Sequence, residues 1–137
     1  MKFNETNQQE TFSKKIYISS AIGSLFGIIT AIILLMIFAA VLSFSDVEES
    51  FLSFFGYLAV VLGSFLGGIV SSIKCKKKGL ILGLFTGILL FIILFIILLI
   101  IVGFDSFTIS TLVQLLLIVV ASTCGGILGV NIKLKRK

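Results

Sequence analysis

Hydrophobic residues fill four long blocks of this chain, and short clusters of charged residues separate the blocks. The uncharged stretches run over residues 16–45, 50–73, 79–104 and 106–132, and are 30, 24, 26 and 27 residues long. A helix needs about 20 apolar residues to cross a hydrocarbon core about 30 Å thick. We therefore expect four membrane-spanning helices. Their expected bounds are residues 16–43, 50–73, 79–103 and 107–131.

The blocks are continuously apolar, which favours helices over the strands of a membrane barrel, where apolar and polar residues alternate. Ser45 and Glu48 have the spacing of a capping box, and this predicts that the second helix begins within the loop that precedes it. Gly103 is expected to end the third helix. The connections are then short, so consecutive helices lie antiparallel. The expected fold is an all-α integral membrane protein, a four-helix transmembrane bundle.

The charged residues predict how this bundle is oriented in the membrane. All eleven basic residues fall on one side of it: Lys2, Lys14, Lys15, Lys74, Lys76, Lys77, Lys78, Lys133, Lys135, Arg136 and Lys137. The opposite side carries only acidic residues: Asp46, Glu48, Glu49 and Asp105. The positive-inside rule places the basic side, and both chain termini with it, in the cytoplasm. We expect a multi-pass protein of the plasma membrane.

This topology divides the chain into five segments. They are a cytoplasmic N-terminal tail (residues 1–15), a first transmembrane hairpin (16–73), a basic cytoplasmic loop (74–78), a second hairpin (79–132) and a basic cytoplasmic tail (133–137). The first apolar block follows a basic segment, as in a secretory signal, but it far exceeds the 7 to 15 residues of a signal core. We expect it to remain as a membrane anchor.

The two hairpins resemble each other in sequence. Gly23 and Gly27 align with Gly83 and Gly87 at an offset of 60 residues. Further along, the double glycine of the second span aligns with that of the fourth, and a basic segment follows each of them. We interpret this as the duplication of one hairpin. Because each copy begins and ends on the same side, the two repeats are parallel.

Small residues recur at every fourth position in all four expected spans. The stripes are Ser19, Gly23, Gly27 and Ala31; Ala59, Gly63, Gly67 and Ser71; Gly79, Gly83 and Gly87; and Ala121, Gly125 and Gly129. Positions four apart share a helix face, where small side chains let two backbones approach closely in a membrane. All stripes lie in the basic-side halves of the spans. We expect close packing there, and helices that diverge or are filled by large side chains on the other side.

Few polar side chains lie within the spans. Gln114 is on the small-residue face of the fourth span, and we expect it to make one interhelical hydrogen bond. The hydroxyls of Thr30, Thr86, Ser122 and Thr123 are expected to bond to carbonyl groups one turn back in their own helices. Cys75 and Cys124 are expected to be structural thiols. A second interpretation of the glycines is that they expose carbonyl groups along a polar path, as in channels and transporters.

Composition narrows the classes of function. Only 12% of the residues are charged, about half the share of a soluble domain. The net charge is +5, but every basic cluster adjoins a span and no aromatic residues interleave with it, so no nucleic-acid partner is expected. The chain has no histidine, and no span contains an ionisable Asp, Glu, Lys or Arg. We therefore expect no enzyme, no catalytic residues, no cofactor and no metal site.

Three sequence features resemble a known family. These are Lys77-Lys78-Gly79 at the start of the third span, the segment 83–87, and the closing segment 125–131 with its Gly-Val-Asn end. They are similar to the YrzE-like family of uncharacterised four-span membrane proteins of Firmicutes, most clearly over residues 76–137. The resemblance implies a bacterial plasma-membrane location and supplies no activity or site residues.

A structural or interaction subunit requires nothing that this sequence lacks. We expect its partners to be the lipid bilayer and either further copies of the chain or another membrane protein. The alternative is a small oligomeric transporter or channel. Transport by such a protein would not use a proton-carrying side chain, because none lies within the spans.

Overall fold

A computed structural model describes residues 2–46, 48–75, 78–106 and 108–135. Its elements are α1 (Lys2–Ser43), α2 (Glu49–Lys74), α3 (Gly79–Val102), the short 3-10 helix η1 (Phe104–Ser106) and α4 (Ile109–Lys135). All four α-helices are long and apolar enough to cross a membrane. No strand occurs within the described residues. These findings confirm the prediction of an all-helical chain with four candidate spans.

Some predicted features lie outside the described residues. They are the basic residues Lys76, Lys77, Arg136 and Lys137, and the expected start of the fourth span at residue 107. The described part of α4 begins at Ile109 and continues to Lys135, four residues past the bound expected from its sequence. Helix ends are the least certain part of a hydropathy pattern, because a helix continues through polar residues that leave the apolar core.

The two predicted helix boundaries have different outcomes. Gly103 follows α3 with a φ of 87°, and its N–H donates a 3.1 Å hydrogen bond to the Leu99 carbonyl oxygen. Glycine adopts this conformation without a steric penalty, so the predicted stop is confirmed. The capping box at Ser45 is wrong. The N–H of Ser45 bonds to the Leu42 carbonyl oxygen in the turn after α1, and α2 begins only at Glu49 without a side-chain cap.

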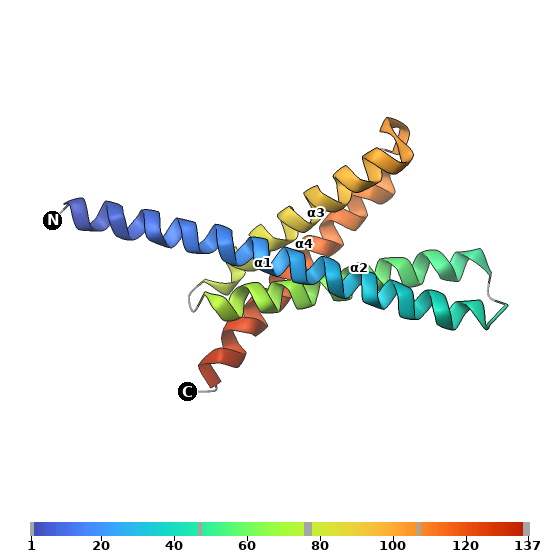
Figure 1. Cartoon of the computed structure of the whole chain (residues 1–137), viewed down its shortest axis with the longest axis horizontal. Helices are drawn as coiled ribbons and strands as arrows, with labels where there is room; N and C mark the ends of the chain where they lie inside the picture. Colours follow the sequence, from blue (N-terminus) through green and yellow to red (C-terminus); the bar gives the residue numbers. More distant parts are fainter. Residues whose placement is uncertain (1, 47, 76–77, 107, 136–137) are drawn as a thin grey trace.

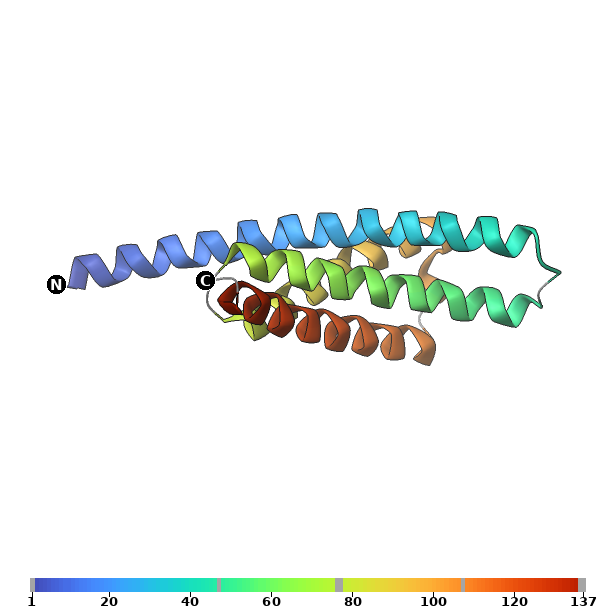
Figure 2. The ribbon, with the colours of Figure 1, turned by 90° about the horizontal axis from the view of Figure 1, so that it is seen from below.

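α1 is much longer than the expected first span. It has 42 residues, and its first part, predicted only as an N-terminal tail, projects beyond the other helices (Figures 1 and 2). At 1.5 Å per residue the helix is about 63 Å long, twice the thickness of a hydrocarbon core. No proline or glycine precedes Gly23 to interrupt it. The Thr6 and Thr11 hydroxyls bond to carbonyls one turn back.

The helices form two antiparallel hairpins that cross each other. α1 pairs with α2, α3 pairs with α4, and α2 lies against α4 as extensively as against α1. In Figure 1 the hairpins cross near their middle and then diverge, so the loop after α1 and the loop after α3 end far apart. We call the end with these two loops the acidic end, and the opposite end, where α2 and α4 finish, the basic end.

Buried residues concentrate in the halves of the helices toward the basic end. The buried set is dominated by glycine, serine and threonine. Among the described residues, its large members with almost no exposure are Leu82, Leu90 and Ile118. Toward the acidic end the helices stay paired through larger side chains, such as Phe38 and Phe55, whose ring centroids are 5.2 Å apart. The closest contacts between the helices therefore lie in the basic-end halves.

Candidate functional site

The four helices meet most closely in one region, which we call the crossing region. It comprises residues 19–31 of α1, 59–72 of α2, 79–90 of α3 and 118–129 of α4. These segments contain all fourteen residues of the predicted stripes and no acidic or basic side chain. The chemistry available within the crossing region is therefore that of backbone groups, hydroxyls and the Cys124 thiol.

α1 and α2 meet along their two stripes. A methyl group built on Gly23 would lie 2.7 Å from the Gly67 carbonyl oxygen, and one on Gly67 would lie 2.8 Å from the Gly23 carbonyl oxygen. Gly27 and Gly63 face each other in the same way, at 3.0 and 2.9 Å. Carbon atoms do not approach oxygen this closely without displacement, so a side chain larger than hydrogen would force the two backbones apart.

The same register continues to both ends of this contact. The Ser19 hydroxyl donates a 2.9 Å hydrogen bond to the Ser71 carbonyl oxygen. A methyl group on Gly63 would also lie 2.7 Å from the Cβ of Ala31. Ala59 and Ser71 are fully buried. Seven of the eight stripe residues of the first hairpin thus lie in a single helix contact.

In the second hairpin, α3 packs on a face of α4 other than the face that carries the predicted stripe. A methyl group on Gly83 would lie 2.5 Å from the Ser122 carbonyl oxygen, and one on Gly79 would collide with the Gly126 carbonyl oxygen. The Ser122 hydroxyl donates a 2.7 Å hydrogen bond to the Gly83 carbonyl oxygen. The α3 stripe therefore packs on Ser122 and Gly126, which were not among the predicted stripe residues of α4.

The predicted stripe of α4 faces α2 instead. A methyl group on Gly125 would collide with the Phe65 carbonyl oxygen, and one on Gly129 would lie 2.7 Å from the Ile69 carbonyl oxygen. Ala121 is half-buried. On the α2 side of this contact a methyl group on Gly68 would collide with the Ser122 carbonyl oxygen. Gly68 also lies outside the predicted stripes.

The two double glycines explain how α2 and α4 each pack closely on two sides. Successive residues of a helix point about 100° apart. Gly67 accordingly faces α1 while Gly68 faces α4, and Gly125 faces α2 while Gly126 faces α3. The aligned residues Gly67 and Gly125 thus make different contacts, one within its own hairpin and one with the other hairpin. The sequence signal for the missed face was the doubled glycine itself.

Hydroxyl groups occupy the remaining space between the helices. The Thr86 hydroxyl donates to the Leu82 carbonyl oxygen at 2.7 Å and lies 2.9 Å from the Ser71 hydroxyl of α2. Thr30 and Thr123 bond within their own helices as predicted. The prediction for Ser122 is wrong, because its hydroxyl bonds across to α3 rather than to its own helix. Among the described residues, only the Ser20 and Ser72 side-chain oxygens are buried without a hydrogen-bond partner.

Gln114 lies outside the crossing region, nearer the acidic end of α4. It is half-buried and borders a cavity of about 220 Å³ between α2, α3 and α4, together with Val60, Phe91 and Ile118. Its side chain makes no hydrogen bond to any other residue in the described part of the chain. The expected interhelical hydrogen bond of Gln114 stays a prediction.

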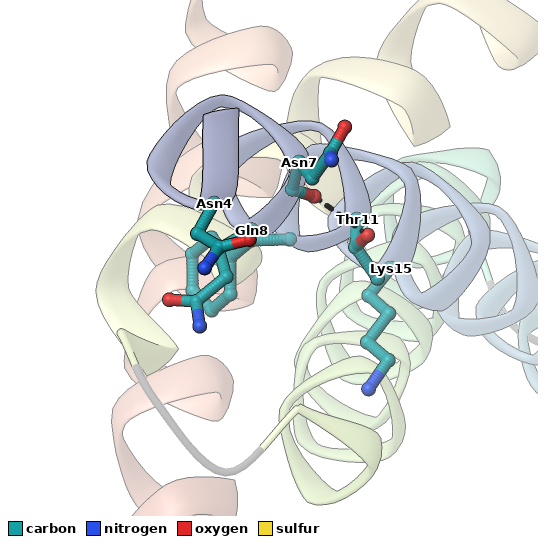
Figure 3. Close-up of a pocket in the computed structure, with 6 residues that line it drawn as sticks. Asn4, Asn7, Gln8, Thr11 and Lys15 are labelled. Carbon is teal, nitrogen blue, oxygen red and sulfur yellow. Dashed lines mark hydrogen bonds between the residues drawn. The ribbon is translucent and has the colours of Figure 1, made fainter. Parts of the chain in front are cut away.

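A larger hollow lies on the projecting part of α1 (Figure 3). It has a volume of about 430 Å³ and is lined by Asn4, Asn7, Gln8, Thr11, Phe12 and Lys15. The Thr11 hydroxyl donates to the Asn7 carbonyl oxygen at 2.8 Å, within the same helix. All six residues belong to one exposed helix, so they would contact a ligand from one side only. This hollow is a feature of the surface and not a binding site.

At the basic end a side-chain hydrogen bond joins the two hairpins. The Lys133 ammonium of α4 donates a 2.7 Å hydrogen bond to the Ile73 carbonyl oxygen, one residue before the end of α2. The last carbonyl groups of a helix lack partners within the helix and carry partial negative charge, so a cation there is favourable. Cys75, just after α2, is buried, and Cys124 is exposed on α4; both are free thiols.

Comparison with known protein families places most of the chain in one of them. The chain matches the family model described as "Protein of unknown function (DUF3792)" over residues 17–129. The matched part includes the whole crossing region and leaves out most of the projecting part of α1. No curated protein and no solved structure matches the chain.

Proposed function

We propose that this chain, which belongs to the DUF3792 family, is a multi-pass membrane protein that serves as a structural or interaction subunit. The observation that carries the proposal is the crossing region, where helix backbones touch at Gly23, Gly67, Gly83 and Gly125. Lipid chains are as apolar as the helices, so the hydrophobic effect does not drive membrane helices together. Close contacts of this kind hold them together instead. The diverging helices extend from this closely packed region.

The proposal includes the orientation of the chain and its membrane. The basic residues near the ends of α2 and α4 lie on the side of the bundle from which α1 projects (Figure 1). The positive-inside rule makes that side cytoplasmic, with both termini inside. A bacterial plasma membrane and the narrower YrzE-like kinship are part of the same proposal. We also propose that the two hairpins arose by duplication, after which their glycine contacts diverged.

The proposed role involves no catalysis, no cofactor and no nucleic acid. Its support is chemical, because the crossing region offers only backbone groups, hydroxyls and one thiol where helices meet. A general base or a metal centre needs a histidine, a carboxylate or clustered ligands. The lipid bilayer and another membrane-protein chain remain the proposed partners.

A flux measurement separates this role from transport. The protein, purified in mild detergent and placed in liposomes, is expected to pass neither small ions nor a panel of small solutes faster than empty liposomes do. An imposed pH gradient is expected to make no difference. Flux well above that of empty liposomes would overturn the structural role and support the small transporter.

A topology measurement tests the orientation separately. Reporter fusions after Asp46 are expected to read as external, and fusions after Cys75 and Lys135 as cytoplasmic. An external signal after Cys75 would overturn both the orientation and the parallel duplication, because the hairpins would then not begin and end on one side.

A further inference from the structure

We propose that the basic end binds the headgroup of an anionic phospholipid, which contacts lysines of both hairpins at once. The inference rests on the proposed membrane location and names one class of lipid as a specific partner. It starts from three lysines that three helices bring together, and we call them the lysine cluster. They are Lys74 at the end of α2, Lys78 just before α3, and Lys133 near the end of α4.

Contacts between the helices hold the lysine cluster together. The Lys133 ammonium donates a 2.7 Å hydrogen bond to the Ile73 carbonyl oxygen, so it lies beside Lys74, the next residue and the last of α2. Lys78 immediately precedes α3, whose first residue packs against Val130, less than one turn before Lys133 on α4. The three charges therefore gather where the two hairpins meet at the basic end.

No acidic side chain pairs with the lysine cluster within the described part of the chain. Among residues 50–137 the sequence has one acidic residue, Asp105, and it lies at the acidic end. Glu5 and Glu10 belong to the projecting part of α1 (Figure 2). Like charges repel one another, and an anion bound among them replaces repulsion with attraction. The lysine cluster therefore selects a negatively charged partner.

The surroundings of the cluster distinguish a phospholipid from other anions. Within two residues of each lysine lies a large apolar side chain that is partly exposed: Ile73, Leu80 and Ile132 are 36%, 52% and 51% exposed. A phospholipid matches both features, because its phosphate meets the ammonium groups and its acyl chains cover the apolar side chains. Free phosphate, nucleic acid or an acidic protein surface would leave those side chains uncovered. In the proposed orientation this end faces the cytoplasmic leaflet, which carries anionic lipids.

The preference of the protein for an anionic lipid tests the inference. Phospholipids with a spin label on one acyl chain are added to phosphatidylcholine liposomes that contain the full chain. The immobilised fraction of the label gives the relative association constant of each lipid. In about 0.1 M salt, labelled phosphatidylglycerol is expected to associate at least about 5-fold more strongly than labelled phosphatidylcholine, the effect of one lysine near an anionic surface. Equal association of both lipids would overturn the inference.

Substitutions with a matched control locate the effect. Lys74→Gln and Lys78→Gln are each expected to lower the preference for phosphatidylglycerol by up to about 5-fold, whereas Lys78→Arg retains it. Lys2→Gln removes the same charge 14 residues before residue 16, about 21 Å along α1. It is expected to have no effect, because this salt screens charges beyond about 10 Å. Thermal unfolding shows that each variant still folds. An equal loss for Lys2→Gln would assign the preference to net charge and overturn the inference.

Inorganic phosphate distinguishes the lipid from a free anion. At equal ionic strength, replacing chloride with phosphate is expected to leave the preference for phosphatidylglycerol unchanged, because free phosphate covers no apolar side chain. Loss of the preference in phosphate would indicate a site for the free anion and overturn the lipid as its occupant.

Failure of this inference and failure of the proposed role look different. A chain that associates equally with both lipids and passes no solute contradicts the lipid site and leaves the structural role in place. A chain that prefers phosphatidylglycerol and passes solute contradicts the structural role and leaves the lipid site in place.

Discussion

α3 is free of charged residues along its whole length, yet its packing changes from one half to the other. Leu82 and Leu90, toward the basic end, are 0% and 2% exposed, whereas Ile100 and Ile101, toward the acidic end, are 77% and 76% exposed. Leucine and isoleucine are equally apolar, so hydrophobicity cannot cause the difference. The two halves differ in the size of their residues. The first half contains Gly79, Gly83 and Gly87, whereas the second half contains only large residues. In these helices, small residues decide where backbones meet.

The largest expected effect comes from adding a side chain to a glycine where α3 packs closely on α4. Gly83→Ala is expected to lower the free energy of unfolding by about 1 to 3 kcal/mol, because the new methyl group would lie 2.5 Å from the Ser122 carbonyl oxygen. The measurement is thermal or denaturant unfolding in detergent at equal protein concentration.

Gly56→Ala is the matched control for this experiment. Gly56 belongs to the acidic-end half of α2, and a methyl group there meets no atom within 4 Å. Alanine favours a helix over glycine by about 1 kcal/mol, so this variant is expected to be neutral or slightly more stable. Equal losses at Gly56 and Gly83 would contradict the idea that close backbone contact distinguishes the two halves.

A smaller effect is expected from the hydroxyl that joins α3 to α4. Ser122→Ala removes the 2.7 Å hydrogen bond to the Gly83 carbonyl oxygen and is expected to cost about 0.6 kcal/mol, and at most about 1.7 kcal/mol. Thr30→Val removes a hydroxyl that bonds within its own helix and is expected to change stability by less than about 0.5 kcal/mol. The two variants are compared by unfolding in the same detergent. A greater loss for Thr30→Val would reverse this order.

A similarly small effect, which depends on salt, is expected at the basic end itself. Lys133→Gln removes the cation that caps the end of α2, and is expected to cost about 0.3 to 1 kcal/mol at low ionic strength. Added salt screens the interaction, so the difference from the native chain is expected to shrink as salt is raised. Lys135→Gln serves as the control, and an equal salt-dependent loss there would assign the effect to total charge.

Much of the fold follows from the sequence because few physical quantities determine it. The thickness of a bilayer sets the length of each apolar block, so four blocks predict four helices. Gly103 was predictable because a helix end in the left-handed region selects glycine. The role of Ser45 was not predictable. Serine fits both a helix cap and the turn that follows α1, and local spacing does not decide between these two roles. The start of α1 was missed because polar residues extend a helix as readily as they form a tail.

The candidate site was only partly predictable, for a geometric reason. Spacing of four residues identifies one face of a helix, and it found the close backbone contact between α1 and α2. It missed Gly68 and Gly126, because a helix that packs on two sides carries a second small face next to the first. Whether Ser122 bonds within its helix or across to α3 depends on which carbonyl comes within reach. That is a property of the assembled bundle.

The unbroken course of α1 joins its exposed arm directly to the first hairpin. The helix continues without interruption from Lys2 to Ser43, and α2 contacts it from Ser19 to Phe38. Asn4 is 15 residues before Ser19, so the exposed arm is about 23 Å long. Because the arm and the part paired with α2 are one helix, a force applied to the arm acts on the whole α1–α2 hairpin.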